Sequence, residues 1–206
     1  ASLAQVYTAK LRTRQKVVIK VQRPNIQPTI KTDLEIMHDL AKYAQEHTPL
    51  GQIYDLVEIA EDFAHTLQNE LDYTIEGRNA DRFRRNFEDE DAVHIPWVYW
   101  EHTTERVLVL EYIEGLKINN IEAIEAAGYD RERIANNAAR MIVQEVLQDG
   151  YFHADPHPGN FVVMADEVIG AMDFGIVGYL SHTDRVNLIR LSNVAVQGDA
   201  RGVTDT

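Results

Sequence analysis

The sequence contains no cysteine, which excludes disulfide bonds, thiolate metal sites and catalysis by a cysteine nucleophile. It also lacks an apolar run of the roughly 18 residues that a helix needs to cross a bilayer. No signal peptide is recognisable, because residues 1–7 already show the pattern of a loop that leads into a strand. The absence of cysteine fits a reducing compartment.

Basic residues are scarce relative to acidic ones, with 20 Lys and Arg against 33 Asp and Glu and a formal net charge of −13. Because binding to a phosphate backbone relies on clustered Lys and Arg, this balance argues against a nucleic-acid partner. A hydrophobic content of 45% with 26% charged residues is ordinary for a globular protein, and 206 residues suffice for one or two domains. Both ends of the chain are expected to be cut from a longer protein.

Hydrophobic periodicity predicts strands followed by long helices in the first half of the chain. Strands are expected over residues 5–11 and 16–22, the first half-buried and the second in the core. A helix is expected over residues 26–47 and is ended by Pro49. A second helix is expected to run without a break from about residue 56 to residue 87.

The second half predicts strands, a hinge and then mainly helices. Strands over residues 93–100 and 106–113 are expected to form a hairpin. The elements expected after the hinge are a helix over 131–148, a short hairpin of 161–164 with 168–172, and a final helix over 182–197. The predicted fold class is therefore α+β and two-lobed, in a truncated fragment. Residues 1–113 are expected to form an N-terminal lobe with a small antiparallel sheet and inserted helices, and residues 114–206 a partial, mainly helical C-terminal lobe, with the chemistry at their junction.

The most informative chemical pattern lies between residues 153 and 175. Asp155 and Asn160 are five residues apart, and Asp173 opens an Asp-Phe-Gly after two short apolar runs. Phosphoryl transfer from a nucleotide needs one carboxylate to orient the acceptor, and an amide and a second carboxylate to hold magnesium. The pattern therefore predicts ATP or ADP with Mg²⁺ as cofactors, Asp155 as a catalytic residue, and Asn160 and Asp173 as metal ligands.

The same segment permits a metal-dependent hydrolase. His153, Asp155 and His157 alternate, and all three are acceptable metal ligands. The remaining histidines form no second cluster in the sequence, however, and the spacing from Asp155 to Asn160 is that of a phosphotransferase loop. The phosphotransferase is the favoured interpretation.

Lys20 ends the apolar run Val17-Val18-Ile19 within the strand expected over residues 16–22. A lysine in that place can pair with nucleotide phosphates while a glutamate on a neighbouring helix holds it. Taken alone, Lys20 is better read as an edge lysine that ends in solvent. Together with Asp155, Asn160 and Asp173 later in the chain, Lys20 is better interpreted as a nucleotide-binding residue.

Together these motifs resemble the UbiB family of atypical protein-kinase-like proteins, also called aarF-domain-containing kinases. The resemblance covers nearly the whole chain and implies a two-lobed protein-kinase-like fold. The segments that carry it are residues 1–7, residues 17–24, residues 69–73 with Glu76 and Asn79, and residues 153–161 with 173–175.

The resemblance assigns roles to particular residues. The opening segment resembles the end of the family's alanine-rich loop, in which alanines restrict a backbone that glycines would leave free to approach phosphates. Glu70 and Asp72 match the family's Glu-x-Asp motif, which is thought to reach into the space where a protein kinase seats its peptide. The residues expected at the nucleotide are Ala1, Ser2, Leu3, Ala4, Gln5, Val6, Lys20, Glu111 and Ile113, with Asn160 and Asp173 acting through Mg²⁺.

Two glutamates are candidates for the partner of Lys20. The spacing of ordinary kinases nominates Glu35, whereas the UbiB pattern assigns the partner to Glu76, which we favour. In the expected continuous helix, Asp72, Glu76 and Asn79 fall on one face at i, i+4 and i+7. Two acids on one face need a cation between them, and Lys20 or Mg²⁺ would supply it.

The resemblance also implies a function, an ATPase or a small-molecule or lipid phosphotransferase that supports isoprenoid quinone biosynthesis. The implied partners are the nucleotide and a lipid or quinone precursor. The implied location is the cytoplasmic side of a membrane, peripheral to it or anchored through regions outside this chain.

Three alternatives remain. An aminoglycoside- or choline-kinase-like phosphotransferase shares a similar His-x-Asp loop but explains neither the opening segment nor the Glu-x-Asp motif. A true protein kinase is disfavoured, because no Ala-Pro-Glu follows Gly175. A nucleotide-sensing scaffold with little turnover stays open.

Overall fold

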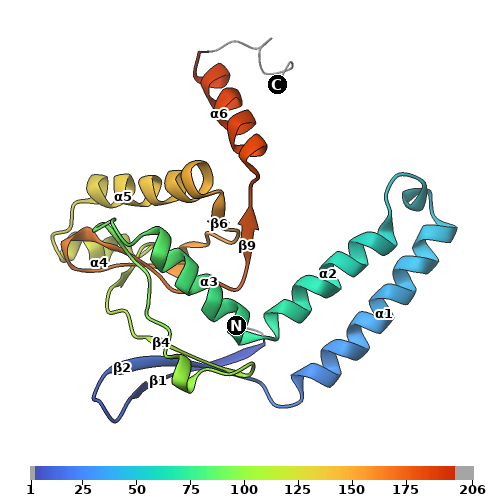
Figure 1. Ribbon diagram of the computed structural model, residues 1–206, viewed down its shortest axis with the longest axis horizontal. Coiled ribbons are helices and arrows are strands. Elements are labelled where there is room, and N and C mark those ends of the chain that lie inside the picture. Colours follow the sequence, from blue (N-terminus) through green and yellow to red (C-terminus); the bar gives the residue numbers. More distant parts are fainter. Residues whose placement is uncertain (1–2, 198–206) are drawn as a thin grey trace. The chain divides into compact units, whose positions relative to one another are not determined.

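The computed structural model describes residues 3–197 of the chain, and Figure 1 labels most of its helices and strands. The elements are, in order, β1 (Ala4–Lys10), β2 (Lys16–Gln22), α1 (Ile26–His47), η1 (Pro49–Gln52), α2 (Leu56–Glu70), α3 (Tyr73–Asn86), β3 (Val93–His94), η2 (Trp100–His102), β4 (Val107–Glu111), β5 (Leu116–Lys117), α4 (Ile121–Ala126), α5 (Arg131–Val143), the π-helix η3 (Gln144–Asp149), β6 (Tyr151–His153), η4 (Pro158–Asn160), β7 (Phe161–Val163), η5 (Ala165–Glu167), β8 (Ile169–Ala171), β9 (Val177–Tyr179) and α6 (His182–Gln197). The mixed helices and small sheets agree with the predicted α+β class.

The chain divides into two compact units. The first unit comprises Ala1–Arg78 and Val98–Tyr112, and the second comprises Asn79–Trp97 and Ile113–Thr206. The predicted N-terminal lobe ends at residue 113 and includes residues 79–97. In the structure, residues 79–97 belong to the second unit instead. Those residues group with the second unit because β3 pairs with β8 and the carbonyl of Asn86 accepts a hydrogen bond from η3.

The sheet of the first unit has the strand order β1-β2-β4, and both pairs are antiparallel. The predicted core position of β2 is confirmed, because β2 is the central strand and Val17 is fully buried. The predicted half-burial of the first strand is wrong: Val6 and Tyr7 are 50% and 53% exposed. β1 is an edge strand, and its alternating sequence does not require that one of its faces be covered.

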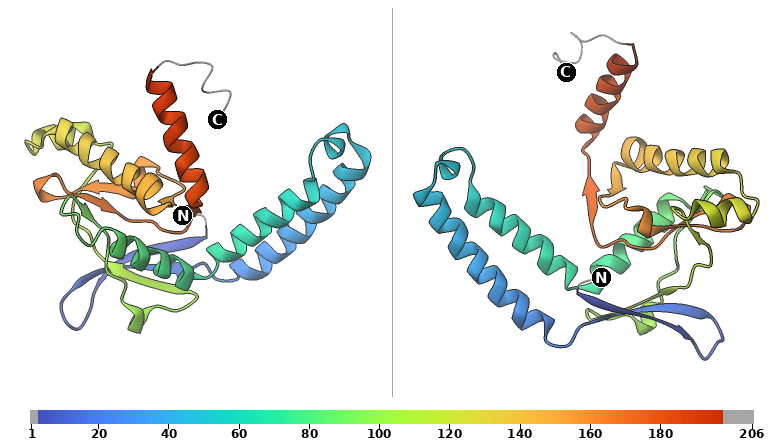
Figure 2. Two further views of the ribbon diagram at one scale, coloured as in Figure 1. Left: turned by 45° about the horizontal axis from the view of Figure 1, so that its top comes forward. Right: turned by 180° about the vertical axis from the view of Figure 1, so that it is seen from behind.

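The helices of the first unit lie in the chain between β2 and β4. α1 has the bounds that its periodicity predicts, and it lies alongside α2 in both views of Figure 2. The predicted continuous helix over residues 56–87 is wrong, because α2 ends at Glu70 and α3 begins at Tyr73. The Oδ1 atom of Asp72 accepts a hydrogen bond from the N–H of Thr74 at 2.9 Å. Aspartate is unfavourable inside a helix and favourable at its start, so the break falls there.

The second unit contains a four-stranded sheet of order β3-β8-β7-β5 and a two-stranded sheet of β6 and β9. The predicted hairpin is confirmed, since β7 and β8 pair antiparallel, and so is the final helix, α6. The predicted helix over residues 131–148 is α5, which continues as the π-helix η3. Three aromatic side chains that are at most 1% exposed lie in the core, Phe83, Tyr151 and Phe174.

The predicted hairpin of residues 93–100 with 106–113 is wrong. β3 has only two residues and pairs with β8 rather than with β4. Val98 makes a single bridge to Leu110, and residues 100–102 form a short helix instead of a strand. Pro96 explains the interruption, because proline has no N–H to donate to a strand ladder.

Candidate functional site

Lys20 lies in the central strand of the first unit, opposite Val6 in β1 and Leu108 in β4. Its ammonium forms an ion pair with the carboxylate of Glu76, which stands in the first turn of α3. The two side chains are only 14% and 8% exposed. Glu35, the other candidate, is exposed on α1. The structure therefore pairs Lys20 with Glu76, and their roles in nucleotide binding stay a prediction.

The start of α3 is anchored to the sheet, and this anchoring places Glu76 beside Lys20. The buried amide of Gln22, at the end of β2, donates to the carbonyls of Leu71 and Glu105. The N–H of Tyr73 donates to the same Glu105 carbonyl at 3.0 Å. Because buried polar groups are costly unless they are hydrogen-bonded, these contacts fix where the first turn of α3 begins.

The Glu-x-Asp motif spans the end of α2 and the start of α3. Glu70 is the last residue of α2, and Asp72 precedes α3 as its N-terminal cap. The prediction that Asp72, Glu76 and Asn79 share one helical face is therefore wrong for Asp72, whose carboxylate is engaged with the N–H and the hydroxyl of Thr74. The contribution of Glu70 and Asp72 to a substrate pocket stays a prediction.

The remaining residues predicted at the nucleotide are distributed as follows. Ala1 and Ser2 lie outside the described residues. The carbonyl of Leu3 accepts a hydrogen bond from the N–H of Arg23 at 3.1 Å. Ala4, Gln5 and Val6 belong to β1 and pair with Gln22, Val21 and Lys20, so Val6 is a cross-strand neighbour of the predicted phosphate lysine. Glu111 ends β4 in the first unit, whereas Ile113 is buried in the second.

The second unit gathers Asp155, Asn160 and Asp173 at one end of the β7–β8 hairpin. Asn160 immediately precedes β7, and its carbonyl accepts a hydrogen bond from the N–H of Met172, next to Asp173, at 2.9 Å. The side-chain amide of Asn160 donates to the carbonyl of Asp155 at 3.1 Å. Asp155 itself is exposed. Three residues identified by their spacing in the sequence therefore come together in the folded unit.

The donor set at this end of the hairpin fits Mg²⁺. Because Nδ2 of Asn160 donates to Asp155, its Oδ1 is the atom that remains for a metal. Asp173 contributes a carboxylate whose Oδ1 accepts the N–H of Gly175 at 3.1 Å, which fixes its orientation. Amide and carboxylate oxygens are the hard ligands that Mg²⁺ prefers. Asn160 and Asp173 are therefore the residues that would hold it.

The alternative of a metal-dependent hydrolase gains no support. Residues 3–197 contain no group of three or more His, Cys, Asp or Glu side chains placed to hold a metal ion. The two histidines of the motif are engaged in the local backbone instead. Nδ1 of His153 accepts the N–H of Asp155 at 3.1 Å, and Nδ1 of His157 accepts the N–H of Gly159 at 3.0 Å.

Asn79 holds the Asp-Phe-Gly segment, a contact that the sequence did not predict. Its Nδ2 donates to the carbonyl of Phe174, and its Oδ1 accepts the hydroxyl of Tyr151, both at 2.9 Å. Burial raises the pKa of Tyr151, so the phenol stays protonated and able to donate. The family motif marks Asn79 in the sequence, but only the tertiary fold shows which residues it contacts.

Glu145 is a buried carboxyl within η3 that the sequence analysis did not single out. Its side chain accepts the N–H of His153 at 3.1 Å. Burial raises the pKa of Glu145 to about 7; the hydrogen bond from His153 opposes this shift, and the charge of Asp149 adds to it. A buried carboxyl with a raised pKa makes stability depend on pH.

We expect Glu145 to destabilise the protein as the pH rises. Its pKa is higher in the folded state than its ordinary value of 4.5, so its stabilising contribution is complete below pH 4.5 and is lost as the pH rises through about 7. The wild type should therefore lose on the order of 3 kcal/mol relative to Glu145→Gln across that range. Urea denaturation of both proteins at a series of pH values measures the difference. A difference that does not change with pH would show that Glu145 titrates near its ordinary value.

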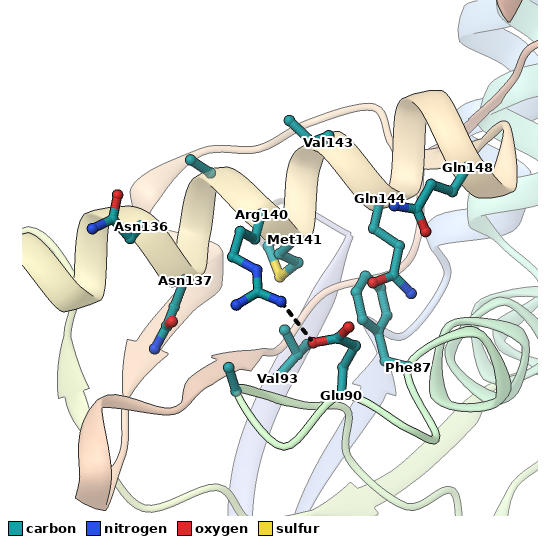
Figure 3. Close-up of a pocket in the computed structure, with 12 residues that line it drawn as sticks. Phe87, Glu90, Val93, Asn136, Asn137, Arg140, Met141, Val143, Gln144 and Gln148 are labelled. Atoms are coloured by element: carbon teal, nitrogen blue, oxygen red, sulfur yellow. Dashed lines mark ion pairs between the residues drawn. The ribbon is translucent and has the colours of Figure 1, made fainter.

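A pocket of about 520 Å³ opens on the second unit, between the segment after α3 and the helices α5 and η3 (Figure 3). Arg140 and Glu90 form an ion pair there, with 3.9 Å between Nη2 and Oε2. None of the residues predicted for nucleotide binding lines it, and no sequence pattern pointed to it. Its lining residues are Phe87, Glu90, Ala92, Val93, Asn136, Asn137, Ala139, Arg140, Met141, Val143, Gln144 and Gln148.

The fold of the chain matches that of a solved structure over its whole length. It superposes on the solved complex of Rv3197 with erythromycin from Mycobacterium tuberculosis with a TM-score of 0.75, over 100% of this chain and 51% of that chain, at 23% identity. At this identity the likeness shows the fold alone.

The chain belongs to the UbiB family of ABC1 atypical kinase-like domains, since the model of that domain matches residues 1–206. It is 42% identical over 203 residues to Protein ACTIVITY OF BC1 COMPLEX KINASE 7, chloroplastic, of Arabidopsis thaliana, covering 98% of this chain and 29% of the relative. It is 40% identical over 194 residues to Probable protein kinase UbiB of Marinobacter nauticus, covering 92% of this chain and 36% of the relative. The chain thus spans about a third of the length of these relatives. Within residues 3–197, no helix has the length and apolar character needed to cross a membrane.

Proposed function

We propose that this domain binds ATP or ADP with Mg²⁺ and either hydrolyses the nucleotide or transfers its phosphoryl group to a small molecule or lipid. The observation that carries the proposal is the grouping of Asp155, Asn160 and Asp173 at one end of the β7–β8 hairpin. The buried ion pair of Lys20 and Glu76 supports it from the first unit.

Each residue has a role in this proposal. Lys20, held in place by Glu76, pairs with the phosphates, and Asn160 and Asp173 hold the metal. Bound Mg²⁺ neutralises negative charge on the phosphates. Asp155, which is exposed, orients the nucleophile, which is water in an ATPase and a hydroxyl group in a phosphotransferase.

A small acceptor fits better than a peptide. Only residues 176–181 separate the Asp-Phe-Gly segment from α6, and β9 occupies three of them. This leaves little chain to form a platform for a peptide. Two relatives are named as kinases, and the name UbiB together with the resemblance described above motivates a role in isoprenoid quinone biosynthesis.

Apolar side chains on the first unit support an apolar partner, either a lipid or quinone precursor or a membrane surface on the cytoplasmic side. Eight large apolar side chains on α1, on α2 and on the segment that joins them are 53–69% exposed, namely Ile36, Leu40, Tyr43, Leu50, Ile53, Tyr54, Ile59 and Phe63. Exposed apolar side chains in this number on one pair of helices are typical of a surface that meets a partner.

Saturating ATP or ADP is expected to raise the melting temperature of the full-length protein only when Mg²⁺ is present. A ligand at 100 times its Kd adds about 2.7 kcal/mol, which corresponds to a shift on the order of 5 °C. Thermal unfolding with each nucleotide, with and without Mg²⁺, measures it. The absence of any Mg²⁺-dependent shift would contradict the proposal.

Turnover then identifies the acceptor. Steady-state ATP hydrolysis is measured alone, with anionic liposomes and with phenolic quinone precursors, and stimulation by either addition is expected. Binding without turnover under all three conditions would favour a nucleotide-sensing scaffold. Phosphorylation of small amines or alcohols would favour a choline-kinase-like enzyme.

A further inference from the structure

Glu145 occupies an unusual place for a carboxylate. It lies in η3, where the helix that begins as α5 changes to π-helical geometry just before β6. Its side chain is 5% exposed. π-Helical turns inside α-helices are rare and are frequent at functional sites, because the altered geometry redirects side chains. A buried carboxyl also needs a hydrogen-bond partner to offset its loss of water.

The partner of Glu145 follows from the pairing of β6. At the two ends of that strand, the carbonyl of Gly150 accepts the N–H of Leu180 at 2.9 Å, and the N–H of Ala154 donates to Ile176 at 3.1 Å. In an antiparallel pair the backbone groups of alternate residues point to opposite sides. The N–H of His153 therefore points away from β9, towards the edge of β6 with which no strand of residues 3–197 pairs.

Glu145 takes the place of a neighbouring strand at that edge. Its Oε2 accepts the N–H of His153 at 3.1 Å. The ring of His153, only 6% exposed, accepts the N–H of Asp155 through Nδ1 at 3.1 Å. The carbonyl of Asp155 in turn accepts the side-chain amide of Asn160 at 3.1 Å. A continuous series of hydrogen bonds thus joins the π-helix to the residues proposed to orient the nucleophile and hold the metal.

We propose that Glu145 is a positioning residue for phosphoryl transfer, which sets the backbone of Asp155 through His153. The proposal rests on the function proposed above. In this role Glu145 does not touch the reacting groups. Its Oε2 holds the backbone of His153 in β6, and the His153 ring in turn holds the backbone N–H of Asp155 in the loop. A misplacement of about 1 Å at a reacting group can lower a rate about 100-fold.

Three substitutions in the full-length protein test this role. Glu145→Leu removes the acceptor oxygen and should lower kcat about 100-fold, while the nucleotide Kd, which depends on Lys20 as well, stays within about threefold. Glu145→Gln keeps an acceptor oxygen without the charge and should restore kcat to within about threefold of wild type. Gln144→Leu is the matched control, because Gln144 stands in the same π-helix (Figure 3) and its side-chain amide donates to the carbonyl of Asn86, outside the loop, at 2.9 Å. Its kcat should stay at the wild-type value.

Amide hydrogen exchange supplies a readout that needs no turnover. In Glu145→Leu the amides of His153 and Asp155 should exchange at least tenfold faster, while those of β7 and β8 keep their wild-type protection. If Glu145→Leu does not fold, Glu145→Asp, which withdraws the oxygen by one methylene, should show the same local change.

The outcomes separate this role from the proposed function itself. Equal loss of kcat in Glu145→Leu and Gln144→Leu, or no rescue by Gln, would reduce Glu145 to a stabilising residue. If the wild type neither binds nor turns over nucleotide, the proposed function fails. Unchanged exchange at residues 153–160 in the variant would overturn the positioning role, whatever the wild-type activity.

Discussion

Replacing Glu76 with Leu is expected to destabilise the protein by about 3–5 kcal/mol. The substitution leaves the ammonium of Lys20, which is 14% exposed, without the carboxylate that it pairs with. Removing one partner of a buried pair is costly because the other charge stays in a poorly solvated place. Urea denaturation measures the loss.

The double substitution Lys20→Met with Glu76→Leu separates stability from function. Replacing a buried ion pair by apolar side chains of similar volume is often neutral or stabilising, so stability should return to within about 1 kcal/mol of wild type. Mg²⁺-dependent nucleotide binding should nevertheless be lost, because the Lys20 ammonium that is proposed to pair with the phosphates is gone. Nucleotide binding at wild-type affinity by the double variant would show that the pair is structural only.

Lys16 provides a control on the same strand. It is exposed at the start of β2, and its ammonium lies 3.4 Å from the centre of the Tyr112 ring. Lys16→Met removes a positive charge at the sheet without breaking a buried pair, so it should cost no more than about 1 kcal/mol and leave nucleotide binding unchanged.

The elements predicted best from the sequence are those whose pattern is set locally. The helices over residues 26–47 and 182–197 have the bounds that their periodicity and flanking residues indicate. The strand over residues 16–22 is likewise found in the centre of its sheet. In each of these, propensity and burial favour the same structure, so local information is sufficient.

The wrong predictions concern places where a contact between residues far apart in the sequence determines where an element ends or which strand it pairs with. The apolar period runs on through Asp72. The break there combines the local cap that Asp72 provides to Thr74 with a distant contact, the Gln22 amide that donates to the carbonyl of Leu71. The two-residue strand β3 joins β8, some 75 residues further along the chain, so its pairing could not be read from its neighbours. Pro96 was the one local signal against the predicted hairpin.

The candidate site divides in the same way. The spacing of Asp155, Asn160 and Asp173 was sufficient to predict that they lie together, because a loop and a short hairpin join them with few residues between. Asn79 and Glu145 are different. Their contacts form only in the folded chain. Asn79 donates to the carbonyl of Phe174, which is 95 residues away in the sequence. Glu145 accepts the N–H of His153 at the edge of β6.

Asp173→Asn is expected to lower Mg²⁺-dependent turnover on the order of a thousandfold. A metal ion supplies several kcal/mol of charge stabilisation in the transition state, and each 1.36 kcal/mol is a factor of ten in rate. The loss should be specific, because an Asn Oδ1 can still accept the N–H of Gly175, which Asp173 accepts at 3.1 Å. The substitution thus removes the negative charge but keeps the local backbone. Nucleotide hydrolysis as a function of Mg²⁺ concentration measures the effect.

Asp166 offers the matched control for this charge. It is exposed in the same unit, and its φ of 58° is one that Asn adopts readily. Asp166→Asn therefore removes one negative charge near the β7–β8 hairpin without straining the chain, and turnover should be unchanged. If both variants lose activity equally, the effect is one of general charge. If neither does, Mg²⁺ is held by other residues, and the assignment of Asp173 is wrong even where nucleotide binding persists. Only a selective loss in Asp173→Asn, relieved in part by a higher Mg²⁺ concentration, is the result that a weakened metal ligand produces.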